Sequence, residues 1–106
     1  MNRPFGAVAI ILTMAASPCA WAAGDPDVGL SLAARWCSSC HADNEAASAS
    51  DAAQSLQHIA RSRAGQSAWL RGWLTSPHPP MPNLNLSRDE IDGIIAYLEK
   101  LAKAPQ

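Results

Sequence analysis

The sequence has little of what marks several common classes of protein. Its 106 residues carry eight basic and nine acidic side chains, so it lacks the basic excess typical of nucleic-acid binding. Its longest apolar run, Phe5 to Ala16, spans about a dozen residues and is too short to cross a bilayer. No stretch alternates apolar and polar residues as a β-strand does. At this length the chain holds one domain at most.

The N-terminus has the three parts of a secretory signal peptide. Arg3 supplies the positive region, residues 5–16 supply the apolar region, and Ala20-Trp21-Ala22 matches the small-residue pattern before a cleavage site. The sequence therefore predicts a signal peptide over 1–22, a mature domain over 23–106 and a periplasmic location. Retention of the N-terminus as a membrane anchor is the alternative to cleavage.

Export would leave few sulfur atoms in the mature domain. Cys19 would be lost with the leader, and Pro18 directly before it fits a lipoprotein signal poorly. Cys37 and Cys40 would then be the only thiols, and Met81 the only thioether. A domain this small buries a modest core and commonly needs a disulfide, a metal or a cofactor for stability. The two thiols point to a cofactor.

The thiols belong to a Cys-x-x-Cys-His run that ends at His41, the pattern of c-type haem attachment. Cys37 and Cys40, three apart at a helix end, present both sulfurs on one side, where two haem vinyl groups can accept them as thioethers. The adjacent His41 then reaches the iron as the proximal ligand. A disulfide is one alternative, although the βαβ context of redox disulfides is missing. Zinc is another, and it would need His58 and His78 as further ligands.

Met81 is the predicted second axial ligand of that iron. It stands in the proline-rich segment 77–82, which predicts an extended, stiff loop. A lone methionine between two prolines is a poor core residue, so iron ligation explains it better than packing. Methionine–histidine ligation raises the reduction potential. His78 is the competing ligand, which would lower the potential, and is otherwise exposed or near the haem rim.

Helical signals recur along the rest of the chain, and no strand signal does. The expected helices cover residues 28–40, 53–61, 66–76 and 88–102. Asp27 is the expected cap of the first helix. Ser87 and Glu90 form the capping box of the last. Gly93 lies inside that last helix, where glycine costs about 1 kcal/mol relative to alanine. We expect it to permit close approach of another helix, and we expect an all-α fold.

The tryptophans are the other large apolar side chains. Trp69 and Trp73 share one predicted helical face with Leu70 and Leu74. We expect both tryptophans to wall the haem pocket, because nothing else in the chain offers equal apolar area. Plain core packing is the alternative. Trp36 directly precedes the haem-attachment run and could pack under the haem edge or between helices.

Together these residues resemble the class I cytochromes c, specifically the small monohaem bacterial type. The resemblance covers about Asp27 to Leu101. Gly29 lies eight residues before Cys37, where these proteins often have the glycine of their N-terminal helix. The segment Trp73–Pro82 resembles the axial-methionine loop of many bacterial members, and Tyr97-Leu98 resembles their C-terminal helix pattern.

The resemblance implies the cytochrome c fold, with short helices and loops wrapped around one haem. In that fold the N-terminal and C-terminal helices cross near Gly29, with Gly93 or Tyr97 at the contact. It also implies a backbone carbonyl that accepts the second N–H of His41. The family's usual proline near that carbonyl is missing here, so a residue near Ala53 or Gln54 must supply it. Ala42 also departs from the family, which often has glycine after the histidine.

The implied function is single-electron transfer through one haem c, bound by Cys37 and Cys40 and ligated by His41 and Met81. The implied partners are a dehydrogenase, an oxidase or another cytochrome, reached by free diffusion or within a complex of which this chain is the haem-bearing subunit. A haem peroxidase and a gas sensor are the other possibilities. A peroxidase needs an open iron with distal acid–base residues, and Met81 argues against that. A gas sensor needs Met81 to leave the iron, and the proline-stiffened loop argues against its release.

Overall fold

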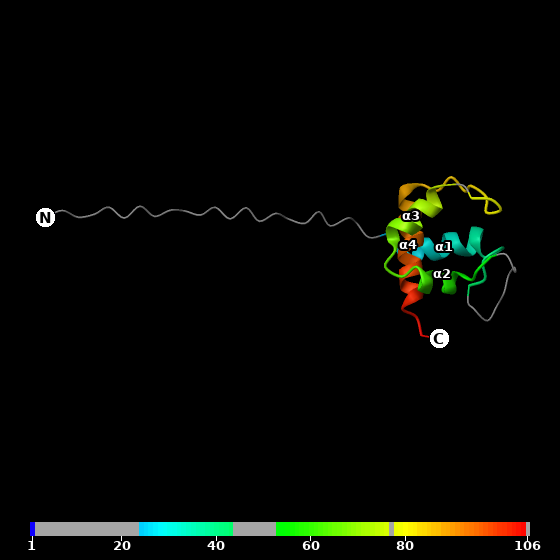
Figure 1. The fold of residues 1–106 in the computed structure, drawn as a ribbon, viewed down its shortest axis with the longest axis horizontal. Helices are drawn as coiled ribbons and strands as arrows, with labels where there is room; N and C mark the ends of the chain where they lie inside the picture. The colour runs from blue at the N-terminus through cyan, green and yellow to red at the C-terminus, as the bar shows by residue number, and fades with distance from the viewer. Residues whose placement is uncertain (2–23, 44–52, 77, 106) are drawn as a thin grey trace.

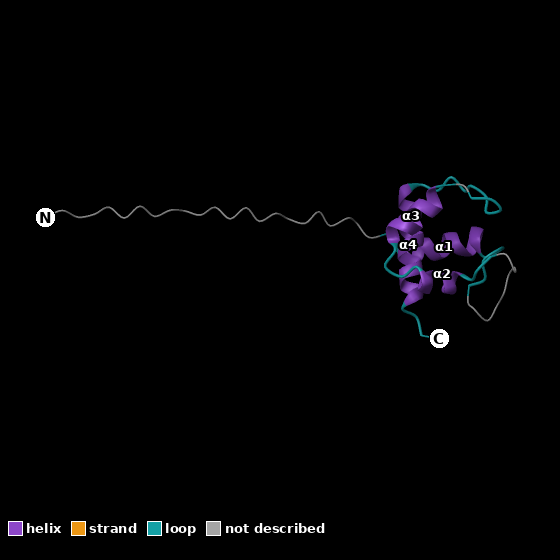
Figure 2. Cartoon of the chain, viewed as in Figure 1, coloured by secondary structure: helices purple, strands orange, loops and turns teal. Residues whose placement is uncertain are grey.

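The computed structural model describes Met1 and residues 24–43, 53–76 and 78–105. Within these ranges the helical segments are α1 (Pro26–Leu32), the π-helical turn η1 (Ala33–Cys37), α2 (Leu56–Ser62), α3 (Ser67–Thr75) and α4 (Arg88–Ala102). The described residues form no strand, and an isolated bridge joins His78 to Met81. Figures 1 and 2 show the four α-helices gathered together, with α1, α2 and α3 placed around α4. The all-α prediction is confirmed.

The predicted leader falls outside the described residues, apart from Met1. Among the helices that the structure does describe, none has the length and apolar character needed to cross a membrane.

The first helix begins earlier than predicted, and Asp25 rather than Asp27 is its cap. The Asp25 side chain accepts the backbone N–H of Asp27 at 2.9 Å. Pro26 occupies the first helical position, where its missing N–H leaves no helical hydrogen bond unmade. The helix also ends earlier than the predicted Cys40. It widens into η1 and stops at Cys37, beyond which the chain turns.

Glycines bring α1 and α4 into backbone contact. A Cβ added to Gly29 would overlap the carbonyl oxygen of Gly93 and would lie 2.7 Å from Cβ of Tyr97. A Cβ added to Gly93 would lie 3.2 Å from the carbonyl oxygen of Asp25. At Gly29 only a residue without a side chain allows this approach, whereas a side chain at Gly93 would require its neighbour to shift by a few tenths of an ångström. The predicted crossing of the first and last helices at Gly29, Gly93 and Tyr97 is confirmed.

The last helix begins at the predicted capping box. The Ser87 hydroxyl accepts the Glu90 backbone N–H at 3.2 Å, and the Glu90 carboxylate accepts the Ser87 backbone N–H at 2.8 Å. Two donors that the helix itself cannot satisfy are thereby paired. This cap sets the start of the helix that supplies the largest share of the core.

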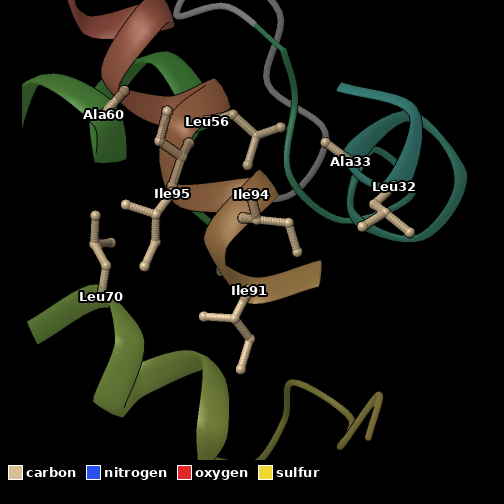
Figure 3. Close-up of a cluster of buried hydrophobic side chains, with 9 residues drawn as sticks. Leu32, Ala33, Leu56, Ala60, Leu70, Ile91, Ile94 and Ile95 are labelled. Atoms are coloured by element: carbon tan, nitrogen blue, oxygen red, sulfur yellow. The ribbon is translucent and has the colours of Figure 1, made fainter. Parts of the chain in front are cut away.

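The core lies where one face of α4 meets the other helices (Figure 3). Its buried residues are Leu32, Ala33, Leu56, Ala60, Leu70, Ile91, Ile94, Ile95 and Leu98. Four of these nine come from α4 at helical spacing, as the periodicity of its isoleucines predicts. α4 thus packs against both α1, which leads into the Cys-x-x-Cys-His run, and α3, which precedes the loop that carries Met81.

Helix α3 divides its predicted apolar face in two. Leu70 is buried and Leu74 packs against the core. Trp69 and Trp73 are 39% and 46% exposed, so they project away from that core. The two leucines fill the contact with α4, and the tryptophans are left on the adjoining flank. The plain core-packing alternative for the tryptophans is therefore wrong.

Candidate functional site

The Cys-x-x-Cys-His run forms a turn at the end of η1. The backbone N–H groups of Cys40 and His41 both donate to the Cys37 carbonyl, at 3.1 and 2.8 Å. The Ser38 hydroxyl closes the preceding turn by donating to the Ala34 carbonyl at 2.7 Å. Two thiols and one imidazole therefore come from a single hydrogen-bonded stretch of backbone.

The two thiols differ in their surroundings, and they are not joined as a disulfide. Cys37 is half-buried and packs against the hydrophobic core, whereas Cys40 is exposed. Burial raises the pKa of the Cys37 thiol above its ordinary value of 9.0. Cys37 therefore carries its proton at neutral pH, and a protonated thiol is a weak nucleophile and a weak metal ligand.

His41 is oriented by a backbone carbonyl. Its Nδ1 lies 2.7 Å from the Gln54 carbonyl oxygen, and because a carbonyl only accepts, Nδ1 carries the proton. Nε2 then presents a lone pair, the state in which histidine binds a metal. The Leu56 N–H donates to the Ala42 carbonyl at 2.7 Å and ties the two segments together. The predicted carbonyl near Ala53 or Gln54 is confirmed, at Gln54.

The loop after α3 contains a tight turn where we predicted an extended stretch. The Met81 backbone N–H donates to the His78 carbonyl at 3.0 Å, with Pro79 and Pro80 between them. The fixed φ of Pro79 suits the first central position of a turn, and the cis Pro79–Pro80 bond accommodates Pro80 at the second. The prediction of an extended loop is wrong over His78 to Met81. In the view of Figure 1, this loop extends to the same side of the molecule as the end of η1.

The turn brings together the two residues that the sequence predicts as competing candidates for the second axial position. His78 Nε2 lies 2.9 Å from Met81 Sδ, and both side chains are half-buried. His78 Nδ1 lies 2.8 Å from the Ser76 carbonyl oxygen. Sequence reasoning named both residues but missed their contact. The signal for it was the spacing of three residues across a proline pair.

A stack of side chains leads from α3 to this turn. Arg63 lies over Trp69 with its guanidinium 3.8 Å from the ring centroid. Trp69 and Trp73 stack with centroids 5.2 Å apart and planes 11° from parallel, and Trp73 lies 3.9 Å from the His78 ring. Trp36 stands apart from this stack, 39% exposed, with Arg35 at 6.0 Å. The stack places large apolar surface beside the two candidate ligands.

The donor set fits haem c. One turn supplies two thiols and an imidazole whose Nε2 is available, a second supplies a thioether, and the exposed tryptophans supply flat apolar surface. The zinc alternative finds less support. Across residues 24–43, 53–76 and 78–105, no group of three His, Cys, Asp or Glu side chains could hold an ion together.

Comparison with known proteins gives a match over nearly the full length. The chain is 38% identical over 103 residues to Cytochrome c-552 of Bradyrhizobium diazoefficiens, and the alignment covers 95% of this chain and 98% of that protein. No family model matches the chain, and no solved structure does. The aligned region is therefore long enough to include the helices, the Cys-x-x-Cys-His turn and the loop after α3.

Proposed function

The chain belongs to the small class I c-type cytochromes, and from that membership we propose that it is a periplasmic electron carrier with one His/Met-ligated haem c. The observation that carries the proposal is the turn at Cys37, Cys40 and His41, in which His41 Nδ1 donates to Gln54 and Nε2 is left for the iron. Haem c supplies a one-electron Fe(III)/Fe(II) couple when bound.

We assign four residues to covalent and axial binding. Cys37 and Cys40 would hold the haem through thioethers, and His41 Nε2 would be the proximal ligand. Met81 Sδ would be the opposite ligand, because it is the thioether of the loop after α3 and is half-buried there. Trp69 and Trp73 would cover one side of the haem, since they are exposed from the core and stacked beside this loop.

This assignment favours electron transfer over catalysis. His41 and Met81 would occupy both axial positions, which leaves no position for peroxide or a gas. The His41 side chain is oriented by Nδ1, which donates to the Gln54 carbonyl, and the backbone at Met81 is fixed by its N–H, which donates to the His78 carbonyl. Cys40 is exposed, so the thioether edge would face solvent, where a redox partner can approach. Such redox encounters bury small interfaces and dissociate readily.

The ligand assignment is tested with Met81→Ala. The variant should keep covalent haem but lose the weak long-wavelength charge-transfer band of methionine-ligated ferric haem. Absence of that band from the wild-type protein would contradict Met81 as the ligand. Rapid hydrogen peroxide turnover by the reduced wild-type protein, or carbon monoxide binding to it at neutral pH, would favour a peroxidase or a sensor instead.

The location is tested separately. Export through the leader 1–22 is expected to give a periplasmic protein that begins at Ala23. Mass spectrometry of the protein from the periplasmic fraction measures its N-terminus. An intact leader on membrane-bound protein would support the anchor alternative.

A further inference from the structure

His41 and His78 are held in the same manner. Their Nδ1 atoms lie 2.7 Å and 2.8 Å from backbone carbonyl oxygens, of Gln54 and Ser76 respectively. A carbonyl only accepts, so Nδ1 is the donor in each ring and Nε2 is the nitrogen left for another partner. Metal-bound histidines nearly always donate their second N–H in this way, which fixes both tautomer and ring orientation. His78 thus makes, through Nδ1, the second hydrogen bond that is typical of a metal-bound histidine.

The Nε2 of His78 points at the thioether that we assign to the iron. It lies 2.9 Å from Met81 Sδ. The contact therefore places two atoms that can each bind iron side by side. The His78–Met81 turn, closed by a backbone hydrogen bond of 3.0 Å, keeps their separation short.

Packing holds the His78 ring as well. The Trp73 ring lies 3.9 Å from it at a tilt of 38°, and Trp73 is itself stacked on Trp69. A histidine whose ring was merely exposed to solvent would need neither the contact with Trp73 nor the contact with the Ser76 carbonyl. An oriented ring loses little conformational entropy on binding, which favours its use as a ligand.

We propose that His78 is a substitute axial ligand, which holds the haem iron through Nε2 when the Met81 thioether is lost. This inference rests on the proposed function, in which Met81 is the native ligand. Its consequence is that loss of Met81 leaves a closed site of lower reduction potential. The protein then remains an electron carrier and exposes no open iron to peroxide.

The test uses the haem-loaded Met81→Leu protein, in which leucine keeps the apolar volume. Its ferric form should be six-coordinate and low-spin, with the near-infrared signature of bis-histidine ligation and a potential below that of wild type. The double variant M81L/H78Q should be high-spin. The matched control M81L/H58N removes the remaining histidine, on α2, and should keep the low-spin spectrum.

Competition with added imidazole gives a second measurement on the same proteins. If His78 holds the iron in roughly ten of every eleven M81L molecules, imidazole should bind M81L about tenfold more weakly than M81L/H78Q. Equal affinities would overturn the proposal, as would a high-spin M81L or a low-spin M81L/H78Q. Circular dichroism checks folding, and Met81→Ala with its double variant replaces Met81→Leu if the latter fails to fold.

Failure of this inference is distinguishable from failure of the proposed function. A wild-type protein that shows the charge-transfer band while M81L is high-spin removes the substitute role and leaves Met81 as the ligand. A wild-type protein without the band, whose low-spin state disappears in H78Q, makes His78 the native ligand and overturns both assignments.

Discussion

At the scale of single residues, the two cysteines of the turn have unequal surroundings. Cys37 packs against the core and Cys40 faces solvent. One thioether would therefore be anchored among apolar side chains, and the other would lie at the surface. Their backbone positions come from the turn itself, since Cys40 and His41 both donate to the Cys37 carbonyl.

Replacing both cysteines tests covalent attachment. Cys37→Ala with Cys40→Ala should give no haem that migrates with the protein on a denaturing gel, because no thioether can form. Ser39→Ala changes an intervening residue without removing the Ser38–Ala34 hydrogen bond and should keep haem staining at the wild-type level. Staining that persists in the cysteine double variant would rule out the c-type linkage.

At the scale of elements, the contact between α1 and α4 is a backbone contact. Gly29 and Gly93 meet where a side chain on either would have to displace its neighbour. Gly72 in α3 has open space where its Cβ would be. Gly29 and Gly93 therefore allow α1 to pack closely against α4, whereas Gly72 allows no close contact of α3.

Two alanine substitutions distinguish these glycines. Gly29→Ala should destabilise the protein by about 1–3 kcal/mol or more, since overpacking forces the backbones apart. Gly72→Ala should stabilise it by roughly 0.5–1 kcal/mol, because alanine has the higher helix propensity. Urea unfolding of both haem-loaded variants measures the free energies. Equal effects of the same sign would contradict the assigned crossing.

The capping box is a second test at this scale. Ser87→Ala removes the acceptor of the Glu90 N–H, so it should lower the free energy of unfolding by about 1 kcal/mol. Ser67→Ala, a change in the first turn of α3, which has no side-chain cap, should have a smaller effect on unfolding. A Ser87→Ala protein as stable as wild type would mean that the cap contributes little to α4.

At the scale of the whole molecule, Tyr97 links the helix crossing to the candidate site. Its pKa is raised above the ordinary value of 10.0, first by burial, then by the negative charge of Asp43 and, in the haem-free chain, by the Cys37 thiolate. A group whose pKa is raised on folding binds its proton more tightly in the folded state. Its contribution to stability is complete below the unfolded pKa and is lost as the pH rises through the folded pKa.

The stability of the protein should therefore fall above about pH 10 through ionisation of Tyr97. Tyr97→Phe removes the ionisable group and should flatten this part of the profile. Urea unfolding of both proteins at a series of pH values from 8 upward measures the difference. Parallel profiles for the two proteins would show that Tyr97 is not responsible.

Much of the fold and the centre of the site could be predicted, because the signals are local. Cys37, Cys40 and His41 are neighbours in one turn, and the Ser87–Glu90 box lies within one helix start. The Gly29–Gly93 crossing followed from the family resemblance. Asp25 displaced Asp27 as the first cap because Pro26 is best placed at the first helical position.

Other features needed the tertiary structure. Every residue near Gln54 has a backbone carbonyl, so only packing selects the one that meets His41. The four apolar residues of α3 read as one face, yet the position of α4 decides that Leu70 is buried and Trp73 exposed. The chain by itself determined which chemical groups are available, through local turns, caps and residue identity. The folded arrangement decided which of them meet, because contacts between distant segments depend on how the helices pack.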